Sequence, residues 1–191
     1  MSTPLHIVSC NGHIDAMKLL IDHGARVDVT DAYMSTPLHR ASWNNNADAV
    51  RLLVDHGAMV NAKNKSGMIP LHEASRNGHI NIIQLLIDHG ANVNEKNRQD
   101  ETPLHDASWY GRIGAMSLLI KNGANINEKD TWGETSLHWA SRRGHTNAIK
   151  LLIDYGANIN EKCNRWYTSL DYATRIGHTV ATQLLNAHGA I

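Results

Sequence analysis

The sequence contains no phenylalanine, only two cysteines and four prolines, and it carries no formal net charge. With 18 basic and 18 acidic residues, no overall field would draw the molecule to nucleic acid or to a membrane surface. Cys10 and Cys163 are too few for a disulfide framework, so we expect a reducing compartment: the cytoplasm, or alternatively the nucleus. No apolar run approaches the ~20 residues of a membrane span, and no signal-peptide pattern opens the sequence.

Catalytic motifs are missing as well. Glycines such as Gly12 and Gly24 recur at the spacing of helix terminators and form no glycine-rich phosphate loop. The carboxylates are scattered, and no serine or cysteine stands in a nucleophile motif with a base nearby. We therefore expect a protein that is not an enzyme, with no catalytic residues and no cofactor.

What the sequence does contain is a repeat with a period of 33 residues. The tetrapeptide Thr-Pro-Leu-His of residues 3–6 returns at each step, with substitutions in the later copies. A Leu-Leu pair followed by Gly-Ala keeps the same spacing. We count six units without insertions, opening near residues 3, 36, 69, 102, 135 and 168. A fixed period of this length is typical of stacked structural repeats.

Each unit predicts two helices and a loop. Threonine is a good N-cap and proline suits the first helical position, so Thr-Pro predicts the start of a short helix. A glycine such as Gly78 ends that helix in a left-handed conformation. The second helix, for example Ile80 to His89, has an apolar stripe too wide for a lone surface helix. Residues 93–102 are polar and predict a hairpin with its tip near Gln99-Asp100.

These features resemble the ankyrin repeat family, whose unit is 33 residues with a Thr-Pro-Leu-His motif at the first helix. The resemblance covers essentially the whole chain. It implies a mainly α fold: an α-solenoid of stacked helix-turn-helix units with projecting β-hairpin loops. The sequence departs from the pattern at Asn45-Asn46 in place of Gly-His, at Arg112 in place of His, and at Asp171 in place of the motif histidine.

We expect one domain over residues 1–191, ending in a partial C-terminal cap. Thr182 and Asn186 stand where the fifth unit has Ile149 and Ile153, and a polar outer face is what a terminal repeat needs. The first unit shows no such change and lacks the hairpin half that would precede Thr3. This favours an N-terminus that is frayed or was cut from a longer chain.

Thirteen histidines invite a metal or acid–base interpretation, but all of them fall in slots of the repeat framework. Five stand in the helix-opening motif, four follow the glycine of the first helix, and four precede the glycine of the second. A zinc site needs several ligands that converge on one point, so we expect no metal site.

Variable chemistry collects elsewhere. The resemblance places the variable slots, seven per unit, at the hairpin tips and on the concave side of the first helix. Seven of 33 slots would hold about two of the ten aromatics if the repeat were indifferent to them. They hold all but Tyr155: Tyr33, Trp43, Trp109, Tyr110, Trp132, Trp139, Trp166, Tyr167 and Tyr172. Trp139 and Tyr172 could equally be packing residues, and Trp166 and Tyr167 could shield the last units.

Arginines share these slots, with an excess in the last two units, where Arg142, Arg143, Arg165 and Arg175 face only Glu134. Trp, Tyr and Arg are the residues enriched at protein-binding hot spots. We therefore expect a monomeric scaffold that binds a protein, in particular an acidic or phosphorylated segment, on its concave face. The candidate partner-binding residues are Trp43, Arg76, Trp109, Tyr110, Trp132, Trp139, Arg142, Arg143 and Arg175.

An alternative hypothesis is binding of a nucleotide or single-stranded RNA, because rings interleaved with arginine provide stacking platforms and phosphate contacts. The small charge excess makes nucleic acid the less favoured partner. A purely structural or engineered scaffold is a third interpretation. The freely varying convex helices, for example residues 15–17 against 81–83, favour a natural sequence.

Overall fold

The computed structural model describes residues 2–191, and in that range it contains twelve short helices and no β-strand. The first helices of the pairs are α1 (Pro4–Asn11), α3 (Pro37–Trp43), α5 (Pro70–Asn77), α7 (Pro103–Trp109), α9 (Ser136–Arg143) and α11 (Ser169–Ile176). The second helices are α2 (Ile14–Asp22), α4 (Ala47–Asp55), α6 (Ile80–Asp88), α8 (Ile113–Lys121), α10 (Thr146–Asp154) and α12 (Thr179–Ala187).

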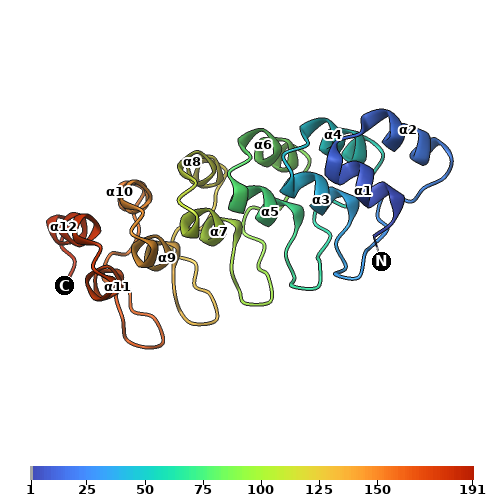
Figure 1. Ribbon diagram of the computed structural model, residues 1–191. Coiled ribbons are helices and arrows are strands. Elements are labelled where there is room, and N and C mark those ends of the chain that lie inside the picture. Colours follow the sequence, from blue (N-terminus) through green and yellow to red (C-terminus); the bar gives the residue numbers. More distant parts are fainter. Residues whose placement is uncertain (1) are drawn as a thin grey trace.

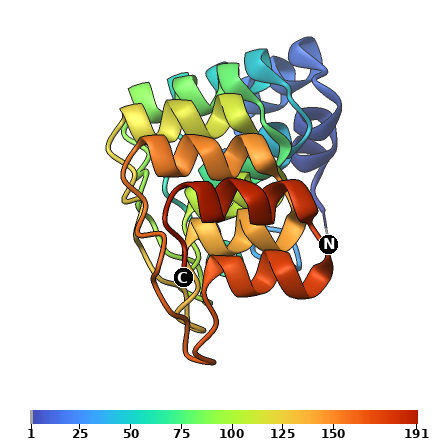
Figure 2. The same cartoon turned by 90° about the vertical axis from the view of Figure 1, so that its left-hand side faces the viewer.

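The helices form two rows. Odd-numbered helices pack against one another along one row and even-numbered helices along the other (Figure 1). Two or three residues join the helices of a pair, and a longer loop leads to the next pair. These loops project from the row of odd-numbered helices, as the view with the C-terminal end towards the reader also shows (Figure 2). We call the surface formed by the odd-numbered helices and the loops the helix-one face.

The helix-opening motif builds each first helix and also ties neighbouring units together. The backbone N–H of Thr36 donates to Nδ1 of His39 at 3.1 Å, so the ring is anchored at the N-cap. Its other nitrogen, Nε2, donates to the carbonyl of Met68 in the next loop at 3.0 Å. The same arrangement recurs from His6 to His138, and it requires a neutral imidazole with its proton on Nε2. These histidines are therefore framework residues.

A second cross-unit hydrogen bond explains two of the departures from the family pattern. His79 Nε2 donates to the carbonyl of Trp43 at the end of the preceding first helix. In the fourth unit Nε of Arg112 donates to the carbonyl of Arg76 at 3.1 Å, and in the second the amide of Asn46 donates to the carbonyls of Ser9 and Cys10. Each replacement therefore keeps a donor aimed at the same helix end.

The core runs through the whole stack. The motif leucines of the first five units, Leu5, Leu38, Leu71, Leu104 and Leu137, are 0–2% exposed, and Leu170 of the sixth is partly buried. Residues of the second helices pack beside them: Met17, Leu53, Leu86, Leu119, Leu152 and Leu185 are all fully buried. The inner units thus bury their apolar stripes against their neighbours, as the repeat pattern predicts, whereas Leu19 on α2 and Val180 on α12 are exposed at the two ends.

The loops differ from the predicted β-hairpins. Each of the five is closed by a single backbone bond across it, such as Asn64 N–H to the carbonyl of Met68, together with a turn at the tip. One backbone bond links a loop to the next, for example from Lys65 N–H to the carbonyl of Tyr33. Two cross-bonds of this kind are too few for a strand ladder, so the loops are hairpin-shaped turns. The tip at Asp100, with a φ of 58°, lies where the sequence predicts it.

The sixth unit differs from the others at the motif position. Asp171 replaces the motif histidine, and its Oδ2 accepts from the backbone N–H of Thr168 at 2.8 Å, so the N-cap bond is kept. Unlike the motif histidine, a carboxylate has no donor for the carbonyl of a following loop. On α12, Asn186 is exposed, whereas the preceding residue, Leu185, is buried.

Candidate functional site

The helix-one face contains an open pocket of about 460 Å³ at α7, α9 and the loops that precede and follow them. Six of the nine predicted partner-binding residues line it: Arg76, Trp109, Tyr110, Trp132, Trp139 and Arg142. Its other lining residues are Glu101, Asp106, Glu134 and Arg165. The fold therefore brings together side chains that lie as far as 89 positions apart in the sequence, from Arg76 to Arg165.

Trp109 is the central ring of the pocket and is half-buried. The guanidinium carbons of Arg142 and Arg143 lie 5.6 and 5.0 Å from its centroid. Trp139 meets it edge-to-face at a centroid distance of 5.4 Å. Trp109 thus faces the pocket and also packs against other side chains of the protein. The sequence alone does not predict this packing role.

Trp139 is hydrogen-bonded to a carboxylate of the loop that precedes α9. Trp139 is 9% exposed, and its indole N–H donates to Oδ2 of Asp130 at 3.1 Å. The other oxygen, Oδ1, accepts from the backbone N–H groups of Trp132 and Glu134, so the same carboxylate orders the loop. Burial raises the pKa of Asp130 to about 6. The sequence left open whether Trp139 is a packing or a binding residue. Most of its side chain is packed inside the chain, and its small exposed surface lies at the pocket.

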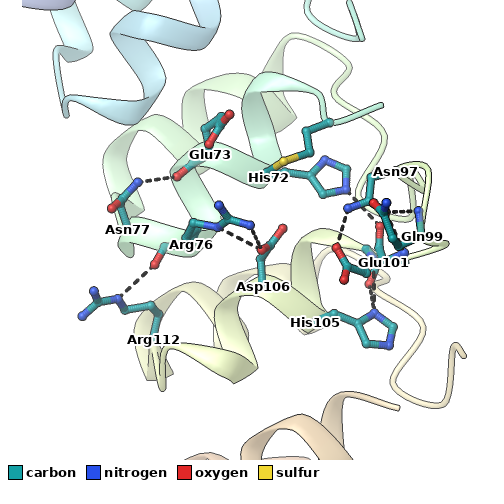
Figure 3. Close-up of polar contacts among 12 residues, drawn as sticks. His72, Glu73, Arg76, Asn77, Asn97, Gln99, Glu101, His105, Asp106 and Arg112 are labelled. Atoms are coloured by element: carbon teal, nitrogen blue, oxygen red, sulfur yellow. Dashed lines mark hydrogen bonds and ion pairs between the residues drawn. The ribbon is translucent and has the colours of Figure 1, made fainter. Parts of the chain in front are cut away.

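The N-terminal wall of the pocket is an ion pair between α5 and α7. Arg76 donates from Nε and Nη2 to Oδ1 of Asp106, at 3.1 and 3.0 Å (Figure 3). Asp106 is 1% exposed, and its Oδ2 has no hydrogen-bond partner within residues 2–191. Burial raises the pKa of Asp106 to about 7, although the adjoining guanidinium lowers it. Arg76, predicted to contact a partner, is therefore already engaged inside the chain.

Tyr110 and Trp132 complete the rim and are 39% and 46% exposed. Tyr110 lies beside two cations, with Arg76 and Arg112 at 5.6 and 6.0 Å from its ring centroid. Trp132 projects from the loop before α9, and its backbone carbonyl accepts from Asn164 N–H of the next loop. Large rings left this open to solvent are candidates for contact with a partner.

Three predicted residues lie outside the pocket. Trp43 is at the end of α3, 43% exposed and two units away. Arg143 adjoins the pocket through Trp109. Arg175 on α11 lies 4.8 Å from the ring centroid of Tyr167 and donates to its hydroxyl.

Arginines and aromatic rings form a continuous series of contacts from the pocket towards the C-terminal end. Arg142 lies between Trp109 and Tyr172, 5.7 Å from the centroid of the latter, and Tyr172 meets Tyr167 at 5.7 Å. We call this series the arginine–aromatic ladder: Arg143, Trp109, Arg142, Tyr172, Tyr167 and Arg175. Within residues 2–191 neither Arg143 nor Arg175 has a carboxylate within ion-pair distance, and Arg142 has one at 3.7 Å, Glu134.

The list of candidate residues from the sequence omits the acidic lining of the pocket. Glu101, Asp106 and Glu134 occupy variable slots, as Arg165 does, so the rule that selected the aromatics could have selected them too. Opposite charges in neighbouring units were the available signal, since Arg76 and Asp106 pair across a unit boundary.

Two further searches concern metal and membrane. Among residues 2–191, His, Cys, Asp and Glu side chains form no group of three or more suited to hold a metal ion. No helix in the same range has the length and apolar character needed to cross a bilayer.

Comparison with known families agrees with the repeat architecture. The family model for ankyrin repeats matches the chain three times, at residues 1–64, 60–130 and 127–191. Its three copies span the chain and do not by themselves fix the number of units. No curated protein matches the sequence.

Proposed function

Since the chain belongs to the ankyrin repeat family, whose members are generally protein-interaction modules, we propose that it binds a protein partner on its helix-one face. The fold is typically a non-catalytic binding scaffold. In this proposal the pocket around Trp109 is the centre of the interface, and the arginine–aromatic ladder extends it towards the C-terminal end.

The observation that supports this proposal best is the ladder. A ring against the flat face of a guanidinium holds that group in place and leaves its N–H edge free to donate. Arg143 and Arg175 present such edges at an exposed surface, and Arg142 does so beside Glu134. Preordered guanidinium groups suit carboxylate or phosphate oxygens, so the ladder favours an acidic or phosphorylated segment of the partner.

The ion pairs narrow this expectation to one end of the face. Arg40 pairs with Asp31, and Arg76 pairs with Asp106, so neither is free for a partner. In the described range the last two units retain three arginines without an ion pair, Arg143, Arg165 and Arg175, whereas the earlier loop tips retain only Lys65 and Arg98. We therefore place the acidic part of the partner over α9, α11 and their loops.

The test is capture from cell lysate by the immobilised protein, followed by mass spectrometry. The variant Trp109→Ala/Trp132→Ala/Arg142→Ala removes two rings and one guanidinium from the pocket. A matched control, Arg51→Ala/Tyr155→Ala, removes an exposed arginine and a ring from second helices and their ends. A protein retained by the wild type and the control but lost on the triple variant supports the proposal. Equal capture by all three proteins, with unchanged circular dichroism, contradicts it.

The same ladder could stack bases and contact phosphates, so nucleotide or single-stranded RNA binding is a second candidate. Nuclease treatment of the lysate separates the two. Capture that survives nuclease is protein recognition, whereas capture that is lost, and that falls steeply with salt, indicates nucleic acid.

A further inference from the structure

The polar groups that line the pocket are engaged with the rest of the protein. Each of the three carboxylates accepts a hydrogen bond from another side chain: Asp106 from Arg76, Glu101 from Asn97 and Glu134 from Tyr172. Three arginines balance these charges, because Arg142 and Arg165 line the pocket together with Arg76. A charge placed deep in the pocket would lose its hydration beside groups that already have partners.

Ring surface is what the pocket offers to a guest. Trp132, from the loop before α9, is 46% exposed, and Tyr110, directly after α7, is 39% exposed. The volume of about 460 Å³ is large enough for a small organic group. Aromatic rings pack favourably edge-to-face or offset against a further ring, as Trp109 and Trp139 already do. The pocket is therefore suited to an uncharged planar group.

The charge that remains available lies at the rim, on Arg165. Its side chain is exposed at the tip of the loop before α11, and no carboxylate in residues 2–191 lies within ion-pair distance of it. Arg143 on α9, whose guanidinium carbon lies 5.0 Å from the ring centroid of Trp109, also has no ion pair in this range. An acidic group next to a guest in the pocket can therefore contact a guanidinium without entering the pocket.

We propose that the pocket binds an aromatic side chain of the partner protein, and that acidic residues adjacent to it in the partner's sequence contact Arg165 and Arg143. The ring of this anchor residue packs against Trp132 and Tyr110, and its burial supplies most of the affinity. The contacts with the guanidinium groups supply orientation and specificity. The inference rests on the proposed function, since it names the residue that anchors the acidic segment.

A nucleotide base is also planar, but it suits this pocket less well. Its edge carries donors and acceptors that lose their water on burial, and the lining carboxylates already accept from the protein's own side chains. A phenyl ring has no such groups. The lining therefore favours an aromatic amino acid, and adenosine monophosphate serves as the competing guest in the experiment.

The probe is the blocked pentapeptide acetyl-Glu-Glu-Phe-Glu-Glu-amide, titrated into the full chain while the indole N–H resonances are followed by NMR. Trp109, Trp132 and Trp139 report on the pocket, and Trp43, two units away, is the reference; single Trp→Phe variants assign the resonances. We expect saturable shifts at the pocket with a dissociation constant on the order of 0.1 mM. Replacement of Phe by Ala in the probe should weaken binding at least about tenfold, and replacement of every Glu by Gln at least about fivefold.

Two substitutions connect each part of the probe to a residue of the protein. Trp132→Ala should weaken binding of the Phe probe at least about fivefold and leave the Ala probe unchanged. Its control, Tyr155→Ala, removes a ring of similar exposure at the end of α10 and should change neither. Arg165→Gln should weaken binding of the acidic probe about threefold and leave the Gln probe unchanged. Its control, Arg98→Gln, removes an exposed arginine at a loop tip two units earlier.

The inference is overturned by equal binding of the Phe and Ala probes, by the absence of shifts at millimolar probe, or by equal effects of either substitution and its control. Tighter binding of adenosine monophosphate at the same tryptophans also overturns it and indicates a nucleotide site. Lysate capture that is lost on the triple variant supports a protein partner on the helix-one face in each of the first three cases, so the two proposals fail separately.

Discussion

Arg76 on α5 and Asp106 on α7 are thirty positions apart and form an ion pair across a unit boundary, with both donors on one carboxylate oxygen. The same spacing joins Trp109 to Trp139 edge-to-face and sets Arg142 against the ring of Tyr172. Variable residues of neighbouring units are thus matched to one another, by charge in one pair and by ring contacts in the others. The helix-one face is a set of packed pairs as well as a binding surface.

Removal of Arg76 should therefore cost stability. The substitution Arg76→Ala leaves a buried carboxylate without its cation, and we expect the free energy of unfolding to fall by about 2 kcal/mol, less than for a fully buried pair because Arg76 is partly exposed. Urea denaturation of the wild type and the variant at neutral pH measures this difference in unfolding free energy. The control Arg98→Ala removes an exposed arginine with no ion pair in the described range and should change stability by less than about 0.5 kcal/mol. Equal effects of the two substitutions would contradict the structural role of the pair.

Asp106 should also make stability depend on pH in an unusual direction. Burial raises its pKa from the ordinary 3.8 to about 7, since desolvation outweighs the effect of Arg76 on α5, while Glu73 on α5 and Glu101 in the loop oppose ionisation further. The folded state then binds a proton more tightly than the unfolded state, so this group adds stability as pH falls from 7 towards 4.

The isostere Asp106→Asn removes that contribution. Between pH 8 and pH 5 the wild type should gain about 2 to 3 kcal/mol relative to the variant. Parallel denaturation curves at the two pH values provide the measurement. A stability difference that stays constant with pH would show that Asp106 is ionised throughout.

The motif histidines should behave in the opposite way. Burial lowers the pKa of His39, His72 and His105 to about 4, because the charged ring loses its hydration, and this outweighs the bond to a loop carbonyl, which raises the pKa. Compared with the ordinary value of 6.5, this corresponds to about 3 kcal/mol per histidine, fully present above pH 6.5 and lost as pH falls towards 4. Ring resonances followed by NMR should show these three histidines neutral at pH 6. Titration near 6.5 would contradict the assigned hydrogen bonds.

The sequence predicts most of this fold because the framework is periodic. Each of the six copies of the motif specifies a helix start, and the first five also specify a buried leucine, so the copies define both the elements and their stacking. The structure of the loops was harder to predict. Asn64 and Met68 make a single backbone hydrogen bond across their loop, whereas a β-hairpin would have a series of such bonds. No local pattern in the loops encodes how many such bonds the projecting chain completes.

The candidate site was predictable in position but not in detail. Position within the unit selected Trp109, Trp132 and Arg142, and the pocket contains all three. The sequence alone did not show that Arg76 is paired or that Trp139 is held by Asp130, because both contacts depend on which slots face each other. Once the structure shows that residues thirty positions apart are in contact, the repeat predicts the corresponding pairs in the other units.

Trp139 allows packing and binding to be separated. The substitution Trp139→Phe keeps a ring against Trp109 but removes the indole N–H, which leaves one oxygen of Asp130 without that donor. We expect a loss of about 1 to 2 kcal/mol in unfolding free energy. The double variant Trp139→Phe/Asp130→Asn offers the internal comparison, and a double-mutant cycle should give a coupling energy of about 1 kcal/mol. Additive effects would indicate that the indole bond contributes nothing.

Trp166 provides the final prediction, because its backbone and its exposure are both unfavourable. It has a φ of 65°, in the left-handed region, and its residue is 77% exposed, so it does not shield the last units as one interpretation of the sequence suggested. Gly67 and Gly133 occupy the same loop position in other units, with φ values of 78° and 72°. Trp166→Gly should therefore raise the free energy of unfolding by about 1 kcal/mol.

A bulky ring kept at a strained, exposed tip is consistent with contact to a partner, so the same variant should be more stable yet retain less partner in the capture experiment. If Trp166→Gly is destabilised, the strain is absent. If it is stabilised with undiminished capture, the ring has no part in the interface.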